Sequence, residues 1–93
     1  MSIARIPREE RDRLLAEKGL AAKRIVEDEI IQAWFSDERG RAAERMIAAP
    51  VSDDQSRRDA ALDIQALDRL WRHLETEAGQ GMAALKTIEK RKA

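Results

Sequence analysis

Small and apolar residues recur between positions 60 and 88 with alternating steps of four and three residues. This is the a/d pattern of a heptad repeat, in which a helix lays one narrow stripe against another helix. The pattern predicts a second helical arm over residues 53–90. Gly79 and Gly81 lie late in this arm, where they either break the helix or let another backbone come close. The stripe consists of Ala60, Ile64, Leu67, Trp71, Leu74, Ala78, Gly81, Leu85 and Ile88.

A first helical arm is predicted over residues 8–49, after an N-terminal lead over residues 1–7. Pro7 suits the first turn of a helix, and apolar residues then recur with helical spacing. Gly19 lies inside this arm and costs about 1 kcal/mol of helix stability relative to alanine. Asp28 could cap a new helix start, which would kink the arm near this residue.

A tight turn over residues 50–52 is expected between the two arms. Pro50 disfavours helix in the residue before it, and Ser52 or Asp53 offers an N-cap for the second arm. The sequence contains no strand signal. Two long helices joined by a short turn predict an all-α fold, an antiparallel helical hairpin within a single domain.

The hairpin also predicts which residues meet. If the turn centres near Val51, then Trp71 faces Ile31. Gly81 and Ala78 then face Ala21, Ala22 and Lys23. Small residues thus meet small residues along the two arms, which supports the hairpin.

Composition excludes several classes of function. The 93 residues include 18 basic and 18 acidic side chains, so the formal net charge is zero, and His73 is the single histidine beside no cysteine. Disulfides and a zinc site are therefore not expected. No phosphate-binding loop, nucleophile elbow or metal-ligand spacing is present, so we expect no enzymatic activity, no cofactor and no small-molecule substrate. We also expect neither a signal peptide nor a membrane span.

Ten large apolar residues are the candidates for helix packing and for an interface with another chain. They are Ile30, Trp34, Phe35, Ile64, Leu67, Leu70, Trp71, Leu74, Leu85 and Ile88. A chain this small rarely builds a sufficient core alone. In a monomeric hairpin, Leu62 and Leu70, with Trp34 or Phe35 opposite, would stay partly exposed. We therefore expect a homo-oligomer or docking on a larger protein.

Charge is unevenly distributed along the chain. Residues 1–24 and 86–93 each carry a net charge of +3, whereas residues 25–85 carry −6. Both ends of a hairpin lie together, so these cations would form a basic tip opposite an acidic turn. The candidates for contact with nucleic acid or an acidic partner are Arg5, Arg8, Arg11, Lys86, Lys90, Arg91 and Lys92. A solubilising end explains the same cations and is the simpler interpretation.

Residues 22–35 and 52–88 resemble a group of small, largely uncharacterised helical proteins of tailed bacteriophages. These proteins share an acidic helix start, a short Pro/Asp turn and a second helix that ends in a glycine. The positions that match are Asp28, Pro50, Asp53, Asp54, Leu67, Leu70, Leu74 and Gly81. Two positions depart from the pattern, since Glu29 stands where the group often has proline and Met46 where a tryptophan is usual.

The resemblance implies a non-enzymatic assembly or structural component of a phage particle, such as a virion or head–tail accessory protein. It would reside in the virion or in the host cytoplasm, and it would act through helix–helix oligomerisation or by docking on a larger phage protein. The alternative is a small-terminase-like DNA-packaging subunit that contacts DNA through the basic tip. No helix-turn-helix pattern accompanies that alternative.

Overall fold

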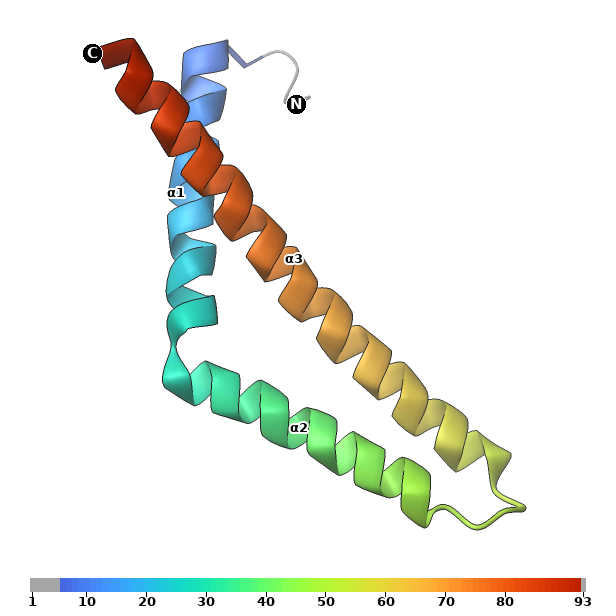
Figure 1. Cartoon of the computed structure of the whole chain (residues 1–93). Coiled ribbons are helices and arrows are strands. Elements are labelled where there is room, and N and C mark those ends of the chain that lie inside the picture. Colours follow the sequence, from blue (N-terminus) through green and yellow to red (C-terminus); the bar gives the residue numbers. More distant parts are fainter. Residues whose placement is uncertain (1–5, 93) are drawn as a thin grey trace. The chain divides into compact units, whose positions relative to one another are not determined.

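The computed structural model describes residues 6–92 of the chain and contains three helices (Figure 1). They are α1 (Arg8–Glu27), α2 (Glu29–Ala48) and α3 (Asp54–Lys92). None of these described residues forms a strand, so the predicted all-α class is confirmed. The expected pair of long helices is a set of three, because the first arm is divided in two.

The division of the first arm lies at Asp28, where the sequence predicts a cap. Asp28 has an extended backbone, with φ −73° and ψ 117°, and it follows the last residue of α1. Its carboxylate oxygen accepts hydrogen bonds from the backbone N–H groups of Ile30, at 2.8 Å, and Ile31, at 3.1 Å. These bonds satisfy donors that the first turn of a helix otherwise leaves without partners. Asp28 therefore begins α2 as a separate helix.

The connection between α2 and α3 is held by one arginine. Arg57 donates hydrogen bonds to the backbone carbonyls of Pro50, at 2.6 Å, Val51, at 2.7 Å, and Ala49, at 3.4 Å. Asp53 precedes α3 and accepts hydrogen bonds from both the backbone N–H and the hydroxyl of Ser56. Of the two caps that the sequence allows, Asp53 is the one observed.

Helix α3 is continuous over its 39 residues. It passes through Gly79 and Gly81 without a break, and no glycine in the described chain has a positive φ. The sequence left two roles open for these glycines. Breaking the helix is excluded for both.

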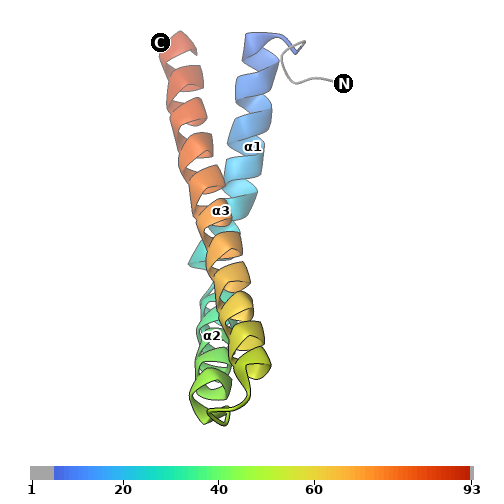
Figure 2. The ribbon, with the colours of Figure 1, turned by 90° about the vertical axis from the view of Figure 1, so that its right-hand side faces the viewer.

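The chain divides into two compact units. The terminal unit is Met1–Val26 with His73–Ala93, and the turn unit is Glu27–Arg72. In the terminal unit α1 runs antiparallel to the C-terminal part of α3, and in the turn unit α2 runs antiparallel to its N-terminal part (Figure 2). Within residues 6–92 the buried hydrophobic residues are all alanines: Ala22 and Ala84 in the terminal unit, and Ala42 and Ala60 in the turn unit.

Candidate functional site: helix contacts and exposed apolar surfaces

In the terminal unit the backbones of α1 and α3 touch at a pair of glycines. A Cβ atom added to Gly81 would lie 3.0 Å from the Leu15 carbonyl oxygen and 3.1 Å from the Gly19 nitrogen. A Cβ added to Gly19 would lie 2.8 Å from the Glu77 carbonyl oxygen and 2.9 Å from the Gly81 nitrogen, and each added atom would collide with the other glycine's Cα. Only glycine at both positions permits this approach.

The close approach at Gly81 agrees with one of the two roles that the sequence allowed. Its partner differs from the prediction, since Gly81 meets Gly19 rather than Ala21 or Ala22. Ala22 is nevertheless buried, at 3% exposure, one turn further along α1. The sequence alone identifies Gly19 only as a residue that lowers helix stability. Its contribution is to the contact between the helices.

Ion pairs flank this contact on the terminal unit. Arg91 Nη2 lies 2.6 Å from Asp12 Oδ2, and the Asp12 side chain is 15% exposed. Glu77 Oε1 lies 3.6 Å from Lys18 Nζ and 3.2 Å from His73 Nε2. The Arg91–Asp12 and Lys18–Glu77 pairs join α3 to α1, whereas His73 and Glu77 both belong to α3. Arg91, a candidate for nucleic-acid contact, is thus engaged within its own chain.

In the turn unit the contact between α2 and α3 is aromatic. The ring centroids of Phe35 and Trp71 are 4.9 Å apart, and those of Phe35 and Trp34 are 5.2 Å apart in an edge-to-face arrangement. The sequence placed Trp71 opposite Ile31, one helical turn earlier on α2. Side chains lean toward the N-terminus of their own helix. In an antiparallel pair this lean moves contacts toward higher residue numbers on both helices, which is the direction of the observed shift.

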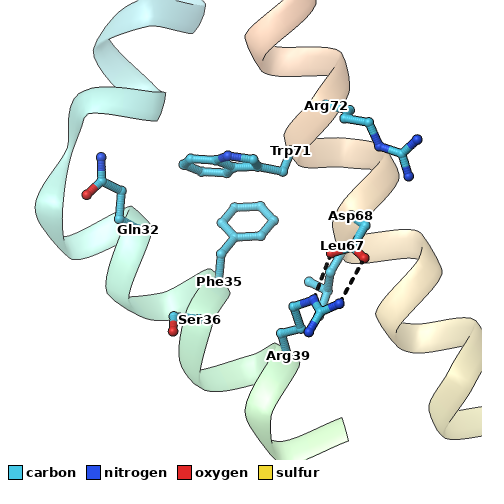
Figure 3. Close-up of a pocket in the computed structure, with 8 residues that line it drawn as sticks. All are labelled: Gln32, Phe35, Ser36, Arg39, Leu67, Asp68, Trp71 and Arg72. Carbon is cyan, nitrogen blue, oxygen red and sulfur yellow. Dashed lines mark hydrogen bonds and ion pairs between the residues drawn. The ribbon is translucent and has the colours of Figure 1, made fainter. Parts of the chain in front are cut away.

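A pocket of about 420 Å³ opens on one face of the turn unit (Figure 3). Its lining consists of Gln32, Phe35, Ser36, Arg39, Leu67, Asp68, Trp71 and Arg72. Arg39 donates two hydrogen bonds to the Asp68 carboxylate, at 2.9 and 3.3 Å. This bidentate pair lowers the pKa of Asp68 and raises that of Arg39. Asp68 is therefore held ionised as a structural partner, and the arrangement joins α2 to α3 rather than preparing a proton transfer.

The opposite face of the turn unit carries large apolar side chains. A hollow of about 220 Å³ is lined there by Glu38, Arg45, Asp63, Ala66 and Leu67, and Arg45 pairs with Asp63 at 2.9 Å. Trp34 lies four residues before Glu38 and Leu70 four residues after Ala66, so both share this face. Trp34 is 52% exposed and Leu70 is 48% exposed. We call Trp34, Leu70 and the hollow the turn-unit face.

The terminal unit has an apolar groove of about 260 Å³ between α1 and α3. Its apolar lining is Ala16, Leu20, Gly81, Met82, Leu85 and Ile88, and its polar rim is Arg13 and Glu17. Leu20 is 49% exposed, and Met82 and Leu85 are each 41% exposed. The Gly19–Gly81 contact leaves no room for side chains between the helices, so these larger residues lie at the side. We call this surface the terminal-unit groove.

The ten predicted packing residues therefore divide into two groups. Six are half-buried: Phe35, Ile64, Leu67, Trp71, Leu74 and Ile88. Four are exposed: Ile30, Trp34, Leu70 and Leu85. Among the described residues, no large side chain is fully buried. Ala42 and Ala84 are buried but do not belong to the ten predicted packing residues. Those residues are large apolar ones, and an alanine is a weaker signal of burial in a helical pattern than a leucine.

The predicted basic residues lie near the start of α1 and the end of α3. Arg8, Lys86, Lys90, Arg91 and Lys92 are exposed, and Arg11 is half-buried. Arg5 lies outside the described residues. Within residues 6–92 no group of His, Cys, Asp and Glu side chains could hold a metal ion. None of the described helices is long and apolar enough to span a membrane.

Comparisons with protein-family models, with curated proteins and with solved structures gave no match.

Proposed function

We propose that this protein is a non-enzymatic helical assembly component that works by burying its apolar surface against other protein chains. The observation that carries the proposal is the burial pattern. Among the described residues, the buried hydrophobic ones are alanines, whereas Trp34, Leu70, Leu20, Met82 and Leu85 are all more than 40% exposed. Large exposed apolar patches mark surfaces that bind other proteins. Association, either with further copies or with a larger partner, would bury them.

Within this proposal the two antiparallel helix pairs belong to one helical hairpin whose first arm is divided at Asp28. A hairpin of this kind presents long helical faces, which suit lateral packing against other helices. The continuity of α3 through both units supports this proposal.

The setting that we propose is the particle of a tailed bacteriophage, in the virion or at the head–tail junction. The support for it is the resemblance of residues 22–35 and 52–88 to small helical phage proteins. The proposed activity depends on the exposed apolar surfaces and not on this setting.

The second candidate function is a small-terminase-like DNA-packaging subunit. The observation that favours it is the exposure of Arg8, Lys86, Lys90 and Lys92, which occupy the beginning of α1 and the end of α3. Exposed cations of this kind bind phosphate groups in a salt-dependent manner. Arg91 contributes less, because its guanidinium pairs with Asp12.

The mass of the purified protein in solution separates these functions. We would measure it by light scattering over a concentration series, with and without a short DNA duplex. The assembly function predicts an oligomer whose mass does not respond to DNA, or a chain that is recruited onto phage particles. The DNA-packaging function predicts a complex with DNA that weakens steeply with salt and on reversing the charges of Lys86, Lys90 and Lys92. A monomer that unfolds as cooperatively as an ordinary globular domain, binds no DNA and is absent from particles would contradict both.

A further inference from the structure

The two units of the chain carry opposite net charges. The described part of the terminal unit has ten basic and seven acidic side chains, a net charge of +3. The turn unit has seven basic and eleven acidic side chains, a net charge of −4. Opposite potentials favour the encounter of two surfaces and suppress contact between like surfaces. A terminal unit is therefore electrostatically suited to a turn unit.

Each unit also has one apolar surface that combines side chains from two helices. The terminal-unit groove is bordered by Leu20 from α1 and by Met82 and Leu85 from α3. The turn-unit face presents Trp34 from α2 and Leu70 from α3. The groove has an almost entirely apolar lining, and the indole ring of Trp34 on the face is 52% exposed. A groove of about 260 Å³ is large enough to receive a side chain of this kind.

We propose that the terminal-unit groove of one copy binds the turn-unit face of a second copy of this chain. The inference rests on the proposed assembly function and identifies its first partner as the protein itself. The charge signs select this pairing over groove with groove or face with face, because like units would bring net charges of the same sign together. Trp34 and Leu70 cover Leu20, Met82 and Leu85, and the acidic side chains of the turn unit approach the basic terminal unit.

The test uses two full-length variants, each with one surface disabled. The groove variant carries Leu20→Glu and Met82→Glu, which introduce acidic groups that would meet an acidic turn unit. The face variant carries Trp34→Lys and Leu70→Lys, which introduce basic groups that would meet a basic terminal unit. Because each change removes a buried apolar side chain from the contact and adds repulsion, we expect each double variant to raise the dissociation constant at least about a hundredfold.

Mixing the variants identifies the pairing. Each variant retains one intact surface, and the two intact surfaces are complementary only if groove binds face. We expect each variant to be monomeric at a concentration where the unmodified chain associates, and a 1:1 mixture to form a complex with one copy of each variant. Native mass spectrometry distinguishes this complex from either homodimer by mass. Circular dichroism verifies that each variant keeps its helices, and Leu70→Lys alone replaces the face variant if the loss of Trp34 disrupts folding.

Matched controls lie elsewhere on the same helices. Leu14→Glu changes an exposed leucine of α1 outside the groove lining, and Ile47→Lys changes an exposed isoleucine of α2 outside the turn-unit face. We expect neither to change the association.

Three results would overturn the inference. They are an unmodified chain that stays monomeric at every concentration, double variants that associate like the unmodified chain, and a mixture that stays monomeric. The proposed function would survive the second and third results, because the unmodified chain would still assemble. It would also survive the first result if the chain is recruited to phage particles.

Discussion

At the scale of single residues, the smallest side chains determine how closely the helices approach. Gly19 and Gly81 bring two backbones into contact, and Ala22, Ala42, Ala60 and Ala84 occupy the buried positions. In the terminal unit this close contact leaves little room for large residues between the helices, so Leu20, Met82 and Leu85 lie at the side. In the turn unit Phe35 and Trp71 pack between the helices, whereas Trp34 and Leu70 are about half exposed.

The glycines give a direct comparison within one helix. An alanine Cβ at position 79 would have no atom within 4 Å. Gly79→Ala should therefore raise the free energy of unfolding by up to about 1 kcal/mol, because alanine favours the helix more than glycine does. Gly81→Ala gains the same propensity but forces α1 away from α3, so we expect a net loss of about 1–2 kcal/mol. Urea unfolding of both variants measures the difference. Equal effects at the two positions would contradict the close contact.

At the scale of secondary-structure elements, the caps define where each helix begins. We expect Asp28→Ala to lower the free energy of unfolding by about 1 kcal/mol, because the N–H groups of Ile30 and Ile31 lose their acceptor. Asp37→Ala, an exposed position inside α2, is the matched control and should be neutral or slightly stabilising. Thermal unfolding followed by circular dichroism compares them. A loss as large at Asp37 as at Asp28 would argue against the cap.

The cap of α3 predicts a pH dependence. Hydrogen bonds from the hydroxyl and the backbone N–H of Ser56 lower the pKa of Asp53. A carboxyl whose pKa is lower in the folded state stabilises the fold above its unfolded pKa of about 4, and this stabilisation is lost as the pH falls through the folded value. Asp53→Asn keeps a good N-cap but cannot titrate. We therefore expect Asp53→Asn to reduce the loss of unfolding free energy as the pH falls below about 4, measured by urea unfolding. An unchanged pH dependence would exclude this role of Asp53.

The predictability of these elements follows from the range of the forces involved. The helices, the stop at Pro50 and the caps at Asp28 and Asp53 depend on neighbouring residues, so the sequence predicts them. The pairings of Gly81 with Gly19 and of Trp71 with Phe35 depend on residues far apart in the chain. The heptad pattern identifies which face of α3 contacts the other helices but not the register of the contact. It also does not predict the ion pairs Arg39–Asp68 and Arg91–Asp12.

At the scale of the whole molecule, the described residues bury only small apolar side chains and leave larger ones exposed. The buried hydrophobic residues are alanines, which contribute little hydrophobic stabilisation, while several leucines and a tryptophan contact solvent. The sequence predicts this small hydrophobic core from the length of the chain and from the apolar residues that lie outside the heptad stripe. It also points to Leu62, Leu70 and Trp34 as residues that stay exposed, and they do. It does not reveal the terminal-unit groove, because that surface is assembled from two helices whose register the sequence does not give.

The most direct test of this account is the unfolding midpoint as a function of protein concentration. If partner chains bury the exposed apolar surface, folding and association are linked, and the midpoint rises with concentration. For a chain of this length we expect a rise on the order of 5 °C over a hundredfold increase. The measurement is differential scanning calorimetry or circular dichroism of the unmodified protein. A midpoint that is high and independent of concentration would contradict the account, because the monomer would then be stable without covering these residues.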